Sequence, residues 1–118
     1  MAIRSTILLV EDDSEVGLEM QHFLDRSGHR VLHASNATEA IEIAEREPPL
    51  VILTDKDLPT FDLLMELLRN RDGRLKDIIV AIIDINDPQL TDSSVVVLPD
   101  FAALDDLIDA THHAPQDT

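Results

Sequence analysis

Short apolar runs recur along the chain, and each ends at polar or turn residues. Four of them are almost wholly apolar, and the run at 30–34 is mixed. Runs this short and this apolar are typical of parallel strands that are covered on both faces. We therefore expect five strands, at 6–10, 30–34, 50–53, 78–83 and 95–98.

The segment after the first strand carries a helical pattern. Four apolar residues recur at i, i+4, i+7 and i+8, the spacing of one helix face, and we expect all four to face the core. They are Val16, Met20, Phe23 and Leu24. Ser14 is expected to cap this helix, and Gly28 to end it.

Three further segments complete the pattern. Asn36 and Glu39 have capping-box spacing for a second helix, a leucine-rich helix is expected at 61–70, and Asp100 is expected to cap a last helix. The segment 84–94 has only two apolar residues, so a loop with at most one helical turn is expected there.

This alternation of strands and helices predicts an α/β fold. Each crossover between parallel strands places its helix on a face of the sheet, which gives a doubly wound five-stranded parallel sheet. No linker divides the chain, so we expect a single domain over 1–118, with a core at about 6–111 and a tail at 112–118.

Two of the expected strands end on acidic residues. Glu11, Asp12 and Asp13 follow the first strand, and Asp55 follows the third. Open α/β sheets bind their ligands outside the carboxyl ends of their strands, so Asp55 lies where a functional residue is expected. The alternative for the first cluster is a solvated helix N-terminus, where the helix dipole favours acids.

Composition restricts the function further. The chain of 118 residues holds 24 acidic and 9 basic residues, a formal charge of −15, which repels nucleic acid and anionic membranes. It has no cysteine, so a metal would be bound through oxygen or histidine. There is no signal-peptide pattern and no apolar stretch of roughly 18 residues, so a cytoplasmic protein without direct nucleic-acid or membrane binding is expected.

The stretches 7–13 and 53–59 together resemble the receiver domain of two-component response regulators, and the likeness extends over about 6–111. It implies a flavodoxin-like fold with strand order 2-1-3-4-5. In that order the first and third strands are neighbours, so Glu11, Asp12 and Asp55 converge. Three carboxylates brought together favour a cation, and oxygen ligands suit Mg²⁺.

The resemblance also implies roles for these residues. Asp55 is the expected phosphoacceptor, which takes a phosphoryl group from a sensor histidine kinase or a phosphotransfer protein. Mg²⁺ is expected on Glu11, Asp12, Asp55 and the backbone carbonyl of Asp57. The output is expected through a downstream protein or a homodimer, and the domain is not expected to be an enzyme.

The sequence departs from the family pattern at several places. Ile83, or Asp84 if the register differs by one, stands where the family has a hydroxyl residue. Leu98 replaces the lysine before Pro99, and Val95 replaces the aromatic switch residue. The fourth helix is shortened or missing, and the family's peptide bond at 98–99 is expected to be cis.

Other interpretations remain open. One is a pseudo-receiver that acts as an interaction module without phosphorylation. Another is a haloacid-dehalogenase-like phosphatase, suggested by the Asp55-x-Asp57 spacing, although that motif stands on the first strand of a larger fold and continues differently. His112 and His113 are a weak metal-site signal, because no third ligand accompanies them.

Overall fold

The computed structural model describes residues 5–55, 57–69, 73–83 and 95–112. It has a five-stranded, fully parallel sheet in the order β2-β1-β3-β4-β5, which confirms the predicted fold and strand order. The strands are β1 (Thr6–Val10), β2 (Arg30–Ala34), β3 (Val51–Thr54), β4 (Ile79–Ile83) and β5 (Val96–Leu98).

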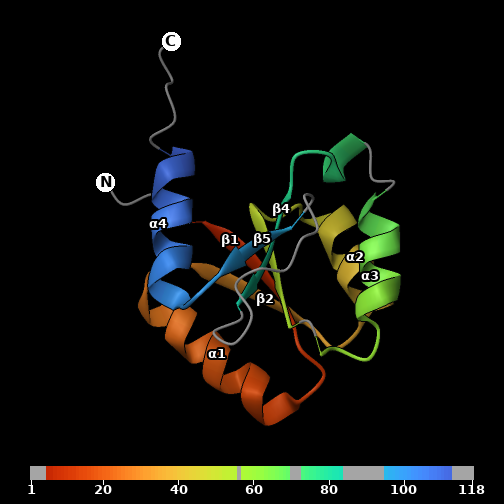
Figure 1. Cartoon of the computed structure of the whole chain (residues 1–118), viewed down its shortest axis with the longest axis horizontal. Coiled ribbons are helices and arrows are strands. Elements are labelled where there is room, and N and C mark those ends of the chain that lie inside the picture. The colour runs from red at the N-terminus through yellow and green to blue at the C-terminus, as the bar shows by residue number, and fades with distance from the viewer. Residues whose placement is uncertain (1–4, 56, 70–72, 84–94, 113–118) are drawn as a thin grey trace.

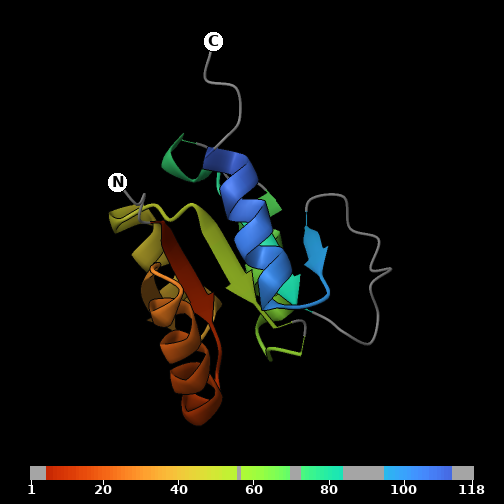
Figure 2. The same ribbon diagram turned by 90° about the vertical axis from the view of Figure 1, so that its left-hand side faces the viewer.

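In the described parts of the chain, four α-helices cover the two faces of this sheet. Figures 1 and 2 show α1 (Ser14–Arg26) and α4 (Phe101–His112) on one face, and α2 (Ala37–Arg46) and α3 (Phe61–Arg69) on the other. A short 3-10 helix, η1 (Gly73–Leu75), precedes β4. This arrangement follows from the right-handed crossovers of a doubly wound sheet.

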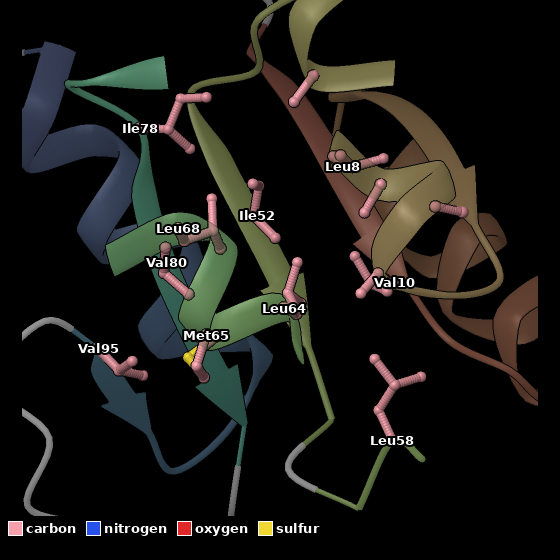
Figure 3. Close-up of a cluster of buried hydrophobic side chains, with 14 of the residues drawn as sticks. Leu8, Val10, Ile52, Leu58, Leu64, Met65, Leu68, Ile78, Val80 and Val95 are labelled. Atoms are coloured by element: carbon pink, nitrogen blue, oxygen red, sulfur yellow. The ribbon is translucent and has the colours of Figure 1, made fainter. Parts of the chain in front are cut away.

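The strand residues alternate between two buried clusters. Leu8 and Val10 of β1 pack toward α2 and α3, as Figure 3 shows for this cluster. Ile7 and Leu9 of the same strand belong to the cluster beneath α1 and α4. Both faces of the central strands are therefore buried, which explains why their sequences are uniformly apolar.

Two of the three helix caps predicted from the sequence are confirmed. Asn36 Oδ1 accepts a hydrogen bond from Glu39 N at 2.9 Å, and Asp100 Oδ1 accepts one from Ala103 N at 2.9 Å, as predicted. At α1 the predicted cap was wrong. Asp13, not Ser14, caps this helix by accepting hydrogen bonds from the backbone N–H groups of its first turn.

The predicted inner face of α1 was also partly wrong. Leu24 is buried and Met20 is half-buried, but Val16 and Phe23 are 40% and 45% exposed. The reason is that α1 turns Gly17 toward the sheet, and Gly17 is buried. A glycine brings the helix backbone close to its neighbour, and the flanking apolar residues are left at the edge.

Several expectations concern the C-terminal half. No cis peptide bond occurs among the described residues, so the expected cis bond at 98–99 was wrong. The last helix includes His112, one residue beyond the predicted core. The segment 84–94, where a loop and a shortened or missing fourth helix are expected, lies outside the described residues, as does the segment from 113. No described helix is long and apolar enough to cross a membrane.

Candidate functional site

The pairing of β1 with β3 brings the acidic residues together. Val10 pairs with Thr54, so Glu11 and Asp55 directly follow neighbouring positions at the carboxyl edge of the sheet. Asp12 and Asp13 continue from Glu11 into the N-terminus of α1. The acids that the sequence singled out therefore occupy one end of two adjacent strands.

Glu11 is the buried member of this group, with 5% of its surface exposed. Its Oε2 accepts a hydrogen bond from Asp13 N at 3.1 Å. Burial raises the pKa of the Glu11 carboxyl, the Asp13 N–H opposes this effect, and the nearby acidic groups of Asp55 and Asp12 raise the pKa further. The carboxyl groups of Asp55 and Asp12 are thus close enough to influence Glu11.

Asp55 is exposed and sits on a tight turn. Its Oδ1 accepts a hydrogen bond from Asp57 N at 3.0 Å, and its carbonyl oxygen accepts one from Leu58 N at 3.1 Å. Leu58 is buried in the cluster of Figure 3 and anchors the turn to the core. The turn orients the Asp55 carboxylate and holds the backbone of Asp57 beside it.

A cavity of about 190 Å³ adjoins these acids. Its walls combine Glu11, Asp55 and Thr54 with apolar side chains from β1, α1, β3 and β4: Val10, Val16, Met20, Leu53 and Ile83. Since Thr54 pairs with Ile82, Ile83 is the β4 residue that follows at the level of Asp55. Among the described lining residues, Ile83 therefore presents a hydrocarbon side chain at this level, which offers no hydrogen-bond donor.

The oxygen atoms at this edge of the sheet are of the kind that binds a hard cation. Within the described parts of the chain, no three His, Cys, Asp or Glu side chains are grouped so that they could hold a metal ion by themselves. Mg²⁺ does not need such a set, since it keeps several waters and is commonly bound by one or two carboxylates. Glu11, Asp12 and Asp55, with the carbonyl of Asp57, are oxygen donors of the right kind.

The structure adds one residue that the sequence gave no reason to select. His33, at the end of β2, has its Nε2 at 3.0 Å from the carbonyl oxygen of Glu11. No spacing motif links these two residues, and only the pairing of β1 with β2 makes them neighbours. The His112-His113 pair, by contrast, lies outside the described side chains.

Known relatives share part of this sequence. It is 41% identical over 56 residues to the alkaline phosphatase synthesis transcriptional regulatory protein PhoP of Bacillus subtilis, and the match covers 48% of this chain and 23% of PhoP. It is 36% identical over 56 residues to the response regulator receiver protein CpdR of Brucella abortus, covering 48% of this chain and 47% of CpdR. The matched region is thus less than half of each relative.

Solved structures share the fold across nearly the whole chain. A CheY-like receiver domain from Methylobacillus flagellatus has a TM-score of 0.73 at 17% identity, covering 92% of this chain and 98% of that one. The receiver domain of the sensor histidine kinase PA1611 from Pseudomonas aeruginosa PAO1, which has magnesium coordinated in its active-site cleft, has a TM-score of 0.70 at 21% identity, covering 91% and 96%.

The family model of the response regulator receiver domain matches residues 7–93. This region includes both acid-tipped strands and Asp55. Receiver domains are generally signalling modules without enzymatic activity, and they interact with histidine kinases and phosphotransfer proteins. From its sequence, its strand order and the position of its acids, the chain belongs to the response regulator receiver domain family of two-component signalling.

Proposed function

We propose that this domain, over 1–118, accepts a phosphoryl group on Asp55 from a sensor histidine kinase or a phosphotransfer protein. The observation that carries the proposal is the β1–β3 pairing, which places Glu11 beside Asp55 at the carboxyl edge. The raised pKa of Glu11, caused first by burial and in part by Asp55 and Asp12, supports the same grouping.

In the proposed reaction an Asp55 carboxylate oxygen attacks the phosphorus of a phosphohistidine. The new O–P bond forms as the P–N bond breaks, and the imidazole leaves with the electron pair of that bond. Asp57 N already binds Oδ1, so we assign the attack to Oδ2. The turn at 55–58 supplies positioning, which is the main contribution a protein makes to phosphoryl transfer.

Glu11, Asp12, Asp55 and the Asp57 carbonyl would hold Mg²⁺ at this edge. A bound Mg²⁺ supplies positive charge that offsets the carboxylates and the phosphoryl oxygens. The chain's own contribution is to bury Glu11 and to fix its carboxylate on Asp13 N. The structurally similar receiver domain of PA1611, which has magnesium coordinated in its active-site cleft, supports this assignment by analogy.

Phosphorylation is proposed to have a weak conformational effect in this chain. Ile83 lines the cavity beside Asp55 and has no donor for a phosphoryl oxygen. Leu98 pairs with Ile83 and provides no cation, and Val95 is a small buried residue. These apolar side chains favour the second candidate function, a pseudo-receiver that binds a downstream protein or its own copy without a phosphate-driven switch.

The test is direct phosphorylation of the purified chain. With Mg²⁺ and acetyl phosphate, intact-mass analysis should show one added phosphoryl group, and Asp55→Asn should show none. Asp57→Asn is the matched control and should still be modified, because the proposal gives the Asp57 side chain no role. An unmodified wild-type chain, or a modified Asp55→Asn variant, would overturn the phosphoacceptor assignment and leave the interaction module.

A further inference from the structure

His33 holds the backbone that carries the two N-terminal acids. A carbonyl oxygen only accepts hydrogen bonds, so His33 Nε2 donates to the Glu11 carbonyl oxygen across the 3.0 Å distance. The ring also lies on α1, because a Cβ added to Gly17 would fall 2.7 Å from Cε1 and 2.8 Å from Nε2 of His33. One side chain thus connects β2, the end of β1 and α1.

Glu11 is held at three points around this contact. Its N–H donates to the Ala34 carbonyl oxygen at 3.0 Å, its carbonyl accepts from His33, and its Oε2 accepts from Asp13 N. The Glu11 carbonyl and the Asp12 N–H belong to the same peptide unit, which is planar. A fixed Glu11 carbonyl therefore also fixes the direction of the Asp12 N–H, and with it the backbone from which the Asp12 side chain projects.

We propose that His33 is a positioning residue for the acidic site. It orients the peptide between Glu11 and Asp12 so that both carboxylates face Asp55. This inference rests on the proposed Mg²⁺ site, but it concerns a residue that supplies no ligand. Outer groups that orient metal ligands typically contribute about 10-fold to 100-fold in metal affinity.

Two substitutions separate the hydrogen bond from packing. His33→Phe keeps an aromatic ring against Gly17 but has no donor. His33→Gln keeps an N–H donor at the same number of bonds from the backbone and removes the ring. Mg²⁺ affinity, measured by calorimetric titration at one fixed pH, should fall roughly tenfold in the Phe variant and stay within about twofold of wild type in the Gln variant.

A measurement without Mg²⁺ tests whether His33 orients the peptide between Glu11 and Asp12. In amide NMR spectra recorded without Mg²⁺, the Asp12 and Asp13 signals should move in His33→Phe and return toward their wild-type positions in His33→Gln. Melting temperatures without Mg²⁺ report whether each variant is folded. If His33 had a purely structural role, the Mg²⁺ affinity of the variants would follow their melting temperatures. It would not depend on whether residue 33 has an N–H donor.

The outcomes are distinguishable. Wild-type binding of Mg²⁺ with unchanged affinity and unchanged Asp12 and Asp13 signals in His33→Phe overturns the positioning role and leaves the proposed function standing. Failure of His33→Gln to restore either readout, in a folded variant, also overturns it. Absence of Mg²⁺ binding by the wild-type chain overturns the proposed cation site itself, and the role of His33 falls with it.

Discussion

At the scale of single residues, the site brings acidic side chains near one another, and this is electrostatically unfavourable for the ionised Glu11 carboxyl. Glu11 is buried, and its pKa is raised by that burial and by the acidic groups of Asp55 and Asp12. The Asp13 N–H and the His33 ring keep Glu11 in place despite this. Functional sites commonly retain such unfavourable electrostatics, because the charge is what binds the ligand.

The first prediction concerns Glu11→Gln. Because the pKa of Glu11 is raised in the folded state, that state binds the proton more tightly than the unfolded state does. An ionised Glu11 therefore costs stability near pH 7, and the cost is relieved as the pH falls through the raised pKa. Without Mg²⁺, Glu11→Gln should be more stable than wild type near pH 7 by about 0.5–2 kcal/mol.

Urea denaturation at two pH values tests this prediction. The advantage of Glu11→Gln should shrink as the pH falls toward about 4 and below, under the ordinary glutamate pKa of 4.5, since Glu11 becomes mostly protonated in both states there. Glu15→Gln is the control, because Glu15 is an exposed acid in the first turn of α1 and should give no gain. A Glu11→Gln variant less stable than wild type near pH 7 contradicts the argument.

At the scale of elements, α1 shows what periodicity can and cannot predict. The spacing of apolar residues predicted the helix, but it selected Val16 and Phe23 as inward, and both side chains are exposed. The true inner face includes Gly17, which a count of hydrophobic residues overlooks. Gly17 lies against the His33 ring, and the position of that ring depends on long-range strand pairing.

The second prediction is that the effect of Gly17→Ala on the stability of the protein reverses its sign when the His33 ring is removed. In an isolated helix, alanine is more favourable than glycine by about 1 kcal/mol. In this protein the new Cβ would lie 2.7 Å from the His33 ring, so the ring must move and its hydrogen bond to Glu11 is lost. Gly17→Ala should therefore destabilise the wild type by about 1–3 kcal/mol, the usual cost of overpacking.

A double-mutant cycle provides the measurement. In a His33→Ala background the obstacle is gone, and Gly17→Ala should stabilise by about 1 kcal/mol through helix propensity alone. Chemical denaturation of the four proteins gives the coupling energy directly. Equal effects of Gly17→Ala in both backgrounds would mean that the ring and the helix are not coupled.

At the scale of the whole molecule, the strand order and the acid-bearing edge followed from the sequence and its resemblance to receivers. The alternation of elements has a physical reason, since strands buried on both faces must be apolar throughout and must alternate with covering helices, whereas the strand order was implied by the resemblance alone. The sequence left the register of β4 open by one residue, because apolar residues fill every position of 78–83. Pairing of Thr54 with Ile82 places Ile83 at the level of Asp55.

The last prediction concerns how far a phosphoryl signal spreads from Asp55. A ligand shifts a conformational equilibrium only by its difference in affinity for the two states. Beside Asp55, β4 presents Ile83, whose partner on β5 is Leu98, and neither side chain can hydrogen-bond a phosphoryl oxygen. With Mg²⁺ and beryllofluoride, amide shifts should therefore change at 11–13 and 55–58 and remain nearly constant along β5.

Ile83→Thr is the matched variant for this experiment. It places a hydroxyl donor on the cavity wall beside Asp55 and keeps the branch at Cβ, although the side chain is one heavy atom smaller, so beryllofluoride should then perturb β4 and β5 more than in the wild type. Asp55→Asn, which removes the proposed acceptor, should abolish the changes in both backgrounds. Large shifts along β5 in the wild-type chain would show that the apolar wall does not block the signal, and would restore an ordinary phosphate-driven switch.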